Sequence, residues 1–158
     1  WTSSLGQSNP PSSRALAVTD EEVLVRHLAG GGATLSALDR ASGDPRWTIA
    51  DGIGDGAAIS AGPETVYVGE SLSVSALDRT SGDERWTMAT GSSAPQPVAT
   101  PETAYVPTGD GIVPVDPASG DQSGNRILYG ERVRSFAVVT GGLYAVTDGS
   151  LIALEVPA

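Results

Sequence analysis

A repeat of about 39 residues constrains the fold of this chain more than any other feature of its sequence. The segments SALDRASGDPRWTIA (36–50) and SALDRTSGDERWTMA (75–89) are nearly identical. Four similar segments each end in an acid, with spacings of 39, 38 and 39 positions between Asp39, Asp78, Asp116 and Glu155. A fixed period of this length indicates one supersecondary unit that is built four times.

Each unit contains four short segments with the pattern of strands, which we name strands A to D. In the first unit, two apolar runs (15–18 and 23–26) precede the segment that ends at Asp39, and RWTIA follows it. Alternating apolar and polar positions between Gly, Pro and Asp favour strands, and no segment has a helical period. A four-stranded unit of this size is typical of a β-propeller blade. A β-sandwich with similar hairpins is the alternative, and the close match of two long copies argues against it.

We therefore predict an all-β fold, a single β-propeller domain over 1–158 with four-stranded antiparallel blades. The four repeats are expected at about 14–50, 57–89, 96–128 and 135–158. The fourth repeat stops after strand C, whereas the chain begins with WT, the pair that opens strand D in the first two repeats. We therefore expect residues 1–6 to complete the last blade, within one chain or in a second copy.

The two best copies share the pattern Ala-x-Asp-x-x-x-Gly-x-x-x-Trp, at 37–47 and 76–86. This pattern resembles the tryptophan-docking motif of PQQ-like propeller repeats. Such repeats occur in quinoprotein alcohol dehydrogenases and in the lipoprotein of the outer-membrane β-barrel assembly machine. The resemblance covers nearly the whole chain and is weaker in the third unit, where Gly124 replaces the Trp. It implies a structural docking set made of Trp1, Trp47, Trp86, Gly43, Gly82, Asp39 and Asp78.

The number of blades stays open at this stage. Members of the PQQ-like family typically form rings of seven or eight blades, so the resemblance implies a ring of more than four. Two chains that pair head to tail would give eight blades, with Trp1 of one chain in the last blade of the other. A closed four-bladed ring and half of a longer chain are the alternatives.

The charge of the chain limits its partners. The net charge is −10, and all nine basic residues are Arg. This balance argues against binding to nucleic acid or to an anionic membrane surface, because both require basic side chains. No apolar run approaches the ~20 residues of a membrane span. An acidic surface without Lys is typical of proteins from salt-adapted microbes, although a GC-rich genome also favours Arg over Lys. We also expect the protein to be exported or to lie at the cell surface.

We expect neither a catalytic site nor a bound cofactor. The resemblance implies that quinone binding needs a cysteine pair and a Lys or Arg, and the chain has no Cys and no Lys. The single histidine, His27, has no spacing typical of a Ser-His-Asp triad. Asp51 and Asp55, in the segment DGIGDG, are the candidates for a calcium site, and a solvated turn is the favoured interpretation.

The function that we expect is a non-catalytic scaffold or binding module for a protein or another ligand. Its partner face is expected on the loops that join strand D of one blade to strand A of the next, because these loops are longer and do not repeat. Tyr129, Arg132 and Arg134 are the candidates for this face, since Tyr and Arg are common at interfaces. The alternatives are a fragment of a PQQ-dependent dehydrogenase-like enzyme and the extracellular sensor domain of a membrane protein.

Overall fold

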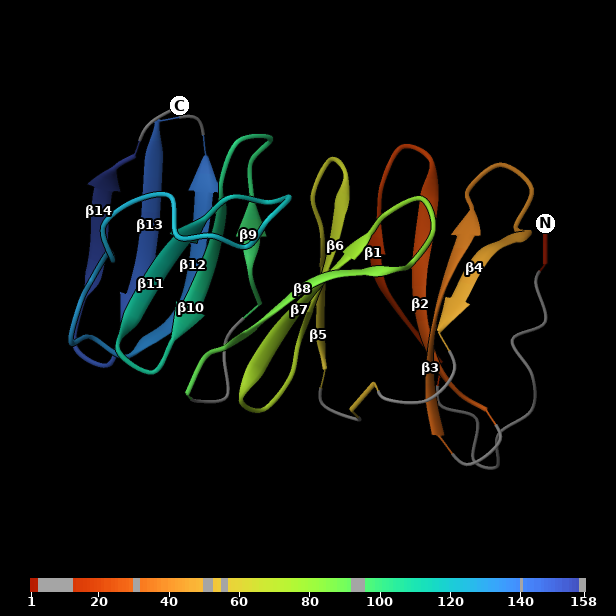
Figure 1. Ribbon diagram of the computed structural model, residues 1–158, viewed down its shortest axis with the longest axis horizontal. Helices are drawn as coiled ribbons and strands as arrows, with labels where there is room; N and C mark the ends of the chain where they lie inside the picture. The colour runs from red at the N-terminus through yellow and green to blue at the C-terminus, as the bar shows by residue number, and fades with distance from the viewer. Residues whose placement is uncertain are drawn as a thin grey trace.

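The computed structural model is an open array of four antiparallel sheets that follow one another in chain order (Figure 1). The structure describes residues 1–2, 13–29, 32–49, 53–54, 57–91, 96–139 and 141–156, and these residues contain no helix. Sheets 1 and 2 have four strands each, and sheets 3 and 4 have three. The all-β architecture predicted from the repeat is therefore confirmed, whereas the array is not closed into a ring.

Within each sheet, the strands lie in chain order. Sheet 1 consists of β1 (Ser13–Val18), β2 (Glu22–Ala29), β3 (Gly32–Asp39) and β4 (Pro45–Ile49). Sheet 2 consists of β5 (Ala58–Ala61), β6 (Thr65–Gly69), β7 (Ser73–Asp78) and β8 (Glu84–Ala89). Sheet 3 consists of β9 (Val98–Ala99), β10 (Ala104–Thr108) and β11 (Gly111–Val115). Sheet 4 consists of β12 (Val133–Val139), β13 (Gly142–Thr147) and β14 (Leu151–Glu155).

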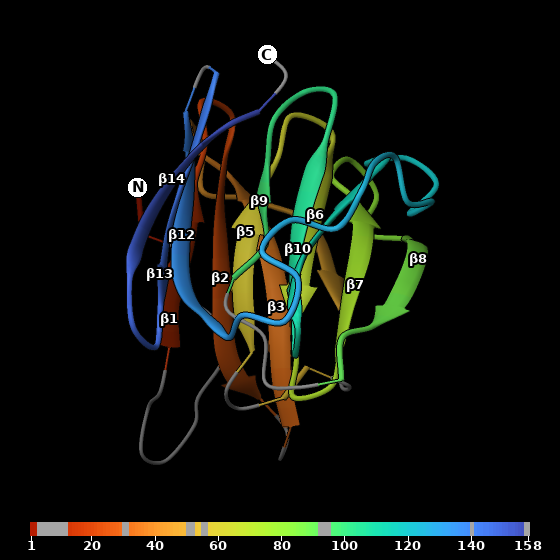
Figure 2. The ribbon, with the colours of Figure 1, turned by 90° about the vertical axis from the view of Figure 1, so that its left-hand side faces the viewer.

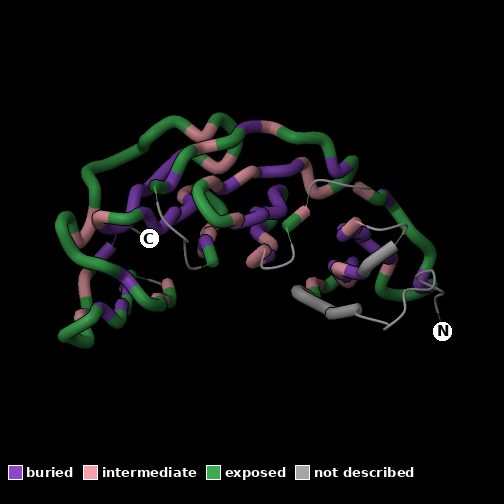
Figure 3. The backbone as a smooth tube through the Cα atoms, turned by 90° about the horizontal axis from the view of Figure 1, so that it is seen from below, coloured by how far each residue is buried: buried purple, intermediate pink, exposed green. Residues whose placement is uncertain are grey.

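The sheets stand side by side with their first strands adjacent. Strand β1 contacts β5, and β9 contacts both β5 and β12. Seen along the strands, the array follows a curve (Figure 3), and sheet 4 lies at one end of it (Figure 2). This arrangement gives the array two rims. The C–D rim carries the A–B turns (19–21, 62–64 and 100–103) and the C–D turns (40–44, 79–83 and 116–121), and the D–A rim carries the B–C turns and the D–A links.

The hydrophobic core consists of three layers, one between each pair of neighbouring sheets. Leu24 and Leu35 of sheet 1 pack with Ile59 and Val66 of sheet 2, and similar clusters join the later sheets. The strands β6, β10 and β11 are buried along their whole length, because each belongs to a sheet with neighbours on both sides. Strand β13 of the terminal sheet instead alternates between buried and exposed residues.

The prediction of a fourth strand in the third repeat is wrong. In place of a strand near 125–129, only isolated bridges join Ile112 to Ile127 and Val115 to Gln122. Leu128 has a φ of 52°, a left-handed conformation that ends an extended run and that β-strands do not contain. Gly124 stands where the other repeats have their Trp, so this segment also lacks the ring that would hold it against the next sheet.

The N-terminal residues do not complete sheet 4 in the described structure. Trp1 and Thr2 belong to no strand, and the N-terminus lies at the opposite end of the array from β14 (Figure 1). Trp1 instead contacts sheet 1, at Gly43. The expected contribution of residues 3–6 lies outside the described residues.

Candidate functional site

Each tryptophan of the chain lies on a glycine in the C–D turn of the next sheet. A Cβ placed on Gly82 would come within 2.9 Å of the indole of Trp47, and one on Gly120 within 2.6 Å of the indole of Trp86. Trp1 covers Gly43 in the same way. These three glycines have φ values of 76–80°, where a side chain causes strain. Glycine is therefore required here both by the backbone and by the ring above it.

The indole nitrogens form hydrogen bonds at the same contacts. Nε1 of Trp47 donates a hydrogen bond to the carbonyl oxygen of Arg79 at 2.8 Å, and Nε1 of Trp86 donates to that of Pro117 at 3.1 Å. Nε1 of Trp1 donates to the carbonyl oxygen of Arg40 at 2.8 Å. Trp1 thus occupies, on sheet 1, the position that the tryptophan of a preceding sheet would occupy.

The aspartate of each motif shapes the turn that receives the ring. Oδ1 of Asp39 accepts hydrogen bonds from the backbone amides of Ala41 and Ser42, both at 2.9 Å. Nη2 of Arg46 donates to Oδ2 of Asp39 at 2.8 Å. The hydrogen bond from Arg46, together with the two amides, lowers the pKa of Asp39 to about 2. The carboxylate therefore stays charged at every physiological pH.

The second repeat reproduces this turn, and the third reproduces only half of it. Asp78 accepts a hydrogen bond from Nη2 of Arg85 at 2.6 Å, and its pKa is also lowered to about 2. Asp116 accepts the amides of Ala118 and Ser119, which lower its pKa. Within the described residues, Asp116 has no arginine partner. The carboxylate that is neutralised in two repeats is therefore left without a cation in the third.

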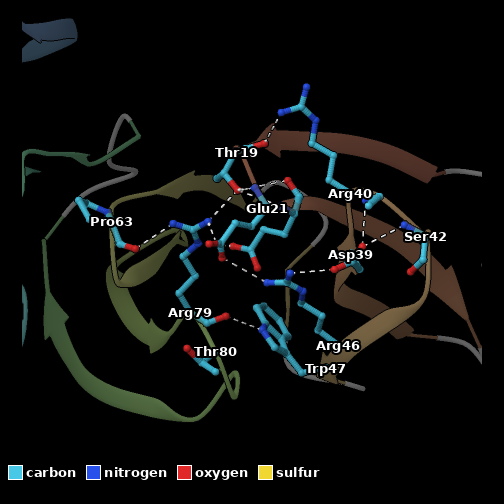
Figure 4. A network of polar contacts seen from close by, with 12 residues as sticks. Thr19, Glu21, Asp39, Arg40, Ser42, Arg46, Trp47, Pro63, Arg79 and Thr80 are labelled. Carbon is cyan, nitrogen blue, oxygen red and sulfur yellow. Dashed lines mark hydrogen bonds and ion pairs between the residues drawn. The ribbon is translucent and has the colours of Figure 1, made fainter.

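A buried ion pair joins sheets 1 and 2 at the C–D rim. Nε of Arg79 donates to Oε1 of Glu22 at 2.6 Å. Nη2 of Arg79 donates to Thr19 Oγ1, and Nη1 donates to the Pro63 carbonyl oxygen, each at 2.8 Å (Figure 4). Glu22 is completely buried. A buried carboxylate needs such a partner, because its desolvation is costly. Neither repetition nor composition marked Glu22 as different from its neighbours, so our sequence analysis missed this pair.

Cavities open on the C–D rim at the junctions between sheets. One of about 350 Å³ lies between sheets 1 and 2, and its charged residues are Glu21, Glu22, Glu64, Arg46, Arg79 and Arg85. Another of about 280 Å³ lies between sheets 2 and 3, which we call the 2/3 cavity. It is lined among others by Glu64, Tyr67, Arg85, Glu102, Asp116 and Pro117. The first cavity has equal numbers of acids and arginines, whereas the 2/3 cavity has three acids and one arginine.

The predicted partner residues Tyr129, Arg132 and Arg134 are exposed near the D–A rim. Arg134 forms an ion pair with Asp148 in a B–C turn. Arg132 forms no hydrogen bond or ion pair with any residue that the structure describes. Tyr129 is 75% exposed, and the guanidinium of Arg126 lies 5.9 Å from its ring centre. Sequence reasoning did not identify Arg126 as a residue that packs against Tyr129.

One face of sheet 4 is apolar and exposed. Tyr144 and Val146 point to this face from β13, opposite Ala153 and Leu151 of β14. Val139 of β12 is exposed at the same end of the array. In sheets 1 to 3, the faces toward the next sheet are covered by that sheet. The face of sheet 4 therefore has the composition of a contact between sheets, although no sheet formed by the described residues lies against it.

The remaining sequence candidates give no catalytic arrangement in the described residues. His27 is buried, with Nε2 3.3 Å from Ser36 Oγ, and no carboxylate among the described residues contacts it. Asp51 and Asp55 lie outside the described residues. Over the rest of the chain that the structure describes, no three His, Cys, Asp or Glu residues lie close enough together to hold a metal ion. The described residues also contain no helix that could span a membrane.

Sheets of three or four antiparallel strands, joined by a tryptophan that docks on the glycine of the next turn, define a propeller-type repeat protein. The family model described as "Outer membrane protein assembly factor BamB", which is a PQQ-like repeat model, matches residues 1–156. The chain belongs to this family, and the resemblance inferred from the docking motif is confirmed. No match is found among curated protein sequences.

Solved structures agree with this assignment. The crystal structure of BamB from Moraxella catarrhalis is 25% identical, with a TM-score of 0.67 over 85% of this chain and 43% of that chain. The chain thus spans less than half the length of that protein. The computationally designed proteins Ika8 and Ika4 are 12% and 16% identical, with TM-scores of 0.71 and 0.70. Ika8 is matched over 90% of this chain and 45% of its own, and Ika4 over 99% of both. At these identities, the designed proteins show the fold alone.

Proposed function

We propose that this chain is a non-catalytic, protein-binding scaffold that acts through its D–A rim. The family model that matches the chain is described as an outer-membrane protein assembly factor. This description supports a role in binding other proteins and a location outside the cytoplasm. Binding sites on repeat scaffolds usually lie on the loops that differ between repeats. Here those loops are the D–A links, whereas the C–D turns repeat closely.

The observation that carries the proposal is the exposed set at Tyr129 and Arg132. Tyr129 is 75% exposed, and Arg132, three residues further along the same link, has no hydrogen bond or ion pair with a described residue. Tyrosine and arginine are among the residues that dominate interface energies. Leu72 and Leu151 are also exposed on B–C turns or next to them. The rim therefore combines exposed apolar side chains with an arginine that has no partner among the described residues.

The test is a quantitative affinity capture from a cell-envelope extract, with tagged chain as bait. The variant Tyr129→Ala/Arg132→Ala is compared with Arg40→Ala, which removes an exposed arginine from the opposite rim. We expect specific partners to fall at least tenfold with the D–A rim variant and to stay unchanged with the control. Partners retained equally by both variants would contradict the proposal.

We also propose that two copies associate head to tail through the ends of the array. The exposed apolar face of sheet 4 and the free edge of β14 support this proposal, since uncovered edges and apolar faces favour association. Trp1 supports it too, because it sits on Gly43 as the tryptophan of a preceding sheet would. In a pair of copies, the segment beginning at Trp1 of one copy would lie beside β14 of the other.

Light scattering after size exclusion gives the test. The expected mass is twice 16.0 kDa for the natural chain. Val146→Asp places a charge on the sheet 4 face and is expected to give the monomer. Leu72→Asp changes an exposed leucine in a turn of sheet 2, away from both ends of the array, and is expected to keep the dimer. A 16.0 kDa species for the natural chain at all concentrations and salt levels would refute the association.

A further inference from the structure

The 2/3 cavity differs from its neighbour between sheets 1 and 2 at three repeat positions, of which two concern arginines and the third places Thr65 where the neighbour has Glu22. Arg79, one residue after the aspartate of the second repeat, corresponds to Pro117 in the third. Arg85, seven residues after that aspartate, corresponds to Ser123. Both arginines of the second repeat place their guanidinium groups at the C–D rim. The third repeat therefore lacks both guanidinium groups at the corresponding positions of its own junction.

Three acids remain around this gap, although the buried acid that binds Arg79 in the first cavity is replaced by Thr65. Asp116 keeps the turn geometry of Asp39 and Asp78, with its two backbone amide donors, and has no basic partner among the described residues. Glu64 and Glu102, from the A–B turns on either side, also line the cavity and form no ion pair with described residues. Arg85 is the one basic residue of the lining, and it is already bound to Asp78 at 2.6 Å. The cavity therefore attracts a cation.

A second observation points to a ligand in the same place. Tyr67 lines the cavity and is 1% exposed, and its hydroxyl makes no well-formed hydrogen bond with any described residue. Buried hydroxyls are nearly always hydrogen-bonded, because an unpaired one keeps the full cost of its desolvation. Burial raises the pKa of Tyr67 to about 12, although a weak side-chain hydrogen bond with Thr65, which falls outside the geometry of a well-formed one, acts to lower it. The hydroxyl is therefore protonated and can accept a hydrogen bond from a cationic donor.

We propose that the 2/3 cavity binds the guanidinium group of an arginine side chain from a partner protein. A guanidinium is planar and carries five donors, so it can serve a carboxylate and a hydroxyl at once. It is also the group that this fold itself places against the same aspartate in the first two repeats. A divalent metal is a poorer fit, since the described residues hold no cluster of three metal-binding side chains. This site lies on the C–D rim and is independent of the D–A rim proposal.

The test uses the peptide acetyl-Gly-Arg-Gly-amide as the probe, titrated into the isotope-labelled chain and followed by NMR. The matched peptide with citrulline in place of arginine keeps the shape and removes the charge. We expect saturable shifts of the Ala118 and Ser119 amides with the arginine peptide, at least tenfold weaker with citrulline because charge-assisted hydrogen bonds are the stronger ones. Equal responses to both peptides, or no saturable response, would overturn the proposal.

Three variants locate the site. Asp116→Asn keeps an oxygen acceptor for the turn amides and removes the charge, and we expect it to weaken binding about tenfold. Asp44→Asn makes the same change elsewhere on the C–D rim and should leave binding unchanged. Ser123→Arg restores the arginine of the earlier repeats and should block the peptide by occupying Asp116. If Asp116→Asn or Ser123→Arg has a native-like spectrum and binds the arginine peptide as tightly as the natural chain does, the assignment is contradicted.

Discussion

The contact between a tryptophan ring and a left-handed glycine can be tested by one substitution with a close control. Gly120 has a φ of 76° and lies under Trp86, so that an added Cβ would come within 2.6 Å of the ring. Gly91 has a φ of 73° and has no atom within 4 Å of such a Cβ. Alanine at either position meets the same backbone strain. Only alanine at Gly120 also meets the ring.

The two effects can be estimated separately. A left-handed backbone costs a residue with a Cβ roughly 1–2 kcal/mol, and this is the whole loss expected for Gly91→Ala. Overpacking adds roughly 1–3 kcal/mol, which gives a loss of about 2–5 kcal/mol for Gly120→Ala. Trp86→Ala removes a ring that is 9% exposed and is expected to cost about 3–5 kcal/mol. Because the clash needs the ring, the double variant should lose less than the sum of the two single losses.

Denaturant unfolding followed by circular dichroism measures all four variants on one scale. The coupling between Gly120→Ala and Trp86→Ala should be about 1–3 kcal/mol, as expected for residues in contact. Equal losses for Gly120→Ala and Gly91→Ala would refute the reasoning, since they would mean that the ring does not press on this glycine. Additive losses in the double variant would have the same meaning.

Two further predictions concern charged groups. Hydrogen bonds from arginines hold the pKa of Asp39 and Asp78 at about 2, below the ordinary 3.8, so the stability that they contribute is present above about pH 4 and is lost as the pH falls toward 2. The variant Asp39→Asn/Asp78→Asn should therefore show a flatter loss of stability over this range in acid-unfolding curves. Arg79→Met leaves the buried Glu22 carboxylate without its cation and is expected to cost about 3–5 kcal/mol in denaturant unfolding. Glu22→Gln/Arg79→Met should cost less, and a larger loss in the double variant would show that the pair is not the cause.

The parts of the fold that repeat could be predicted from sequence, because the same local physics recurs in each unit. The spacing of Asp39 and Asp78, with a glycine four positions later, located the C–D turns and the order of strands in the first two sheets. Strand D of the third unit was mispredicted because apolar residues such as Ile127 and Leu128 satisfy a strand pattern locally. The left-handed φ of Leu128 depends on tertiary context, which no pattern of residue types reveals.

The candidate sites were harder to predict, because they depend on which side chains meet across two sheets. Glu22 and Arg79 are separated by 57 positions, and nothing in either segment marks them as partners. The buried hydroxyl of Tyr67, which makes no well-formed hydrogen bond with a described residue, is equally invisible, since a tyrosine within a strand normally indicates core packing. A signal did exist at the third repeat. An aligned comparison of the repeats shows that Pro117 and Ser123 replace two arginines, and this difference could have indicated an uncompensated Asp116.

Both candidate binding surfaces follow from the same departure of the third repeat from the repeat pattern. Gly124 in place of a tryptophan removes the anchor of strand D, and the chain from 121 to 132 becomes a long link that presents Tyr129 near the D–A rim. The neighbouring Ser123 removes the arginine of the same hairpin, and Asp116 has no cationic partner among the residues that the structure describes. In the first two repeats, the tryptophan packs on the glycine of the next turn, and the aspartate of the motif binds an arginine. Among the described residues, the irregular hairpin lacks the tryptophan and arginine contacts that its equivalents have, and for this reason we propose binding at both of its ends.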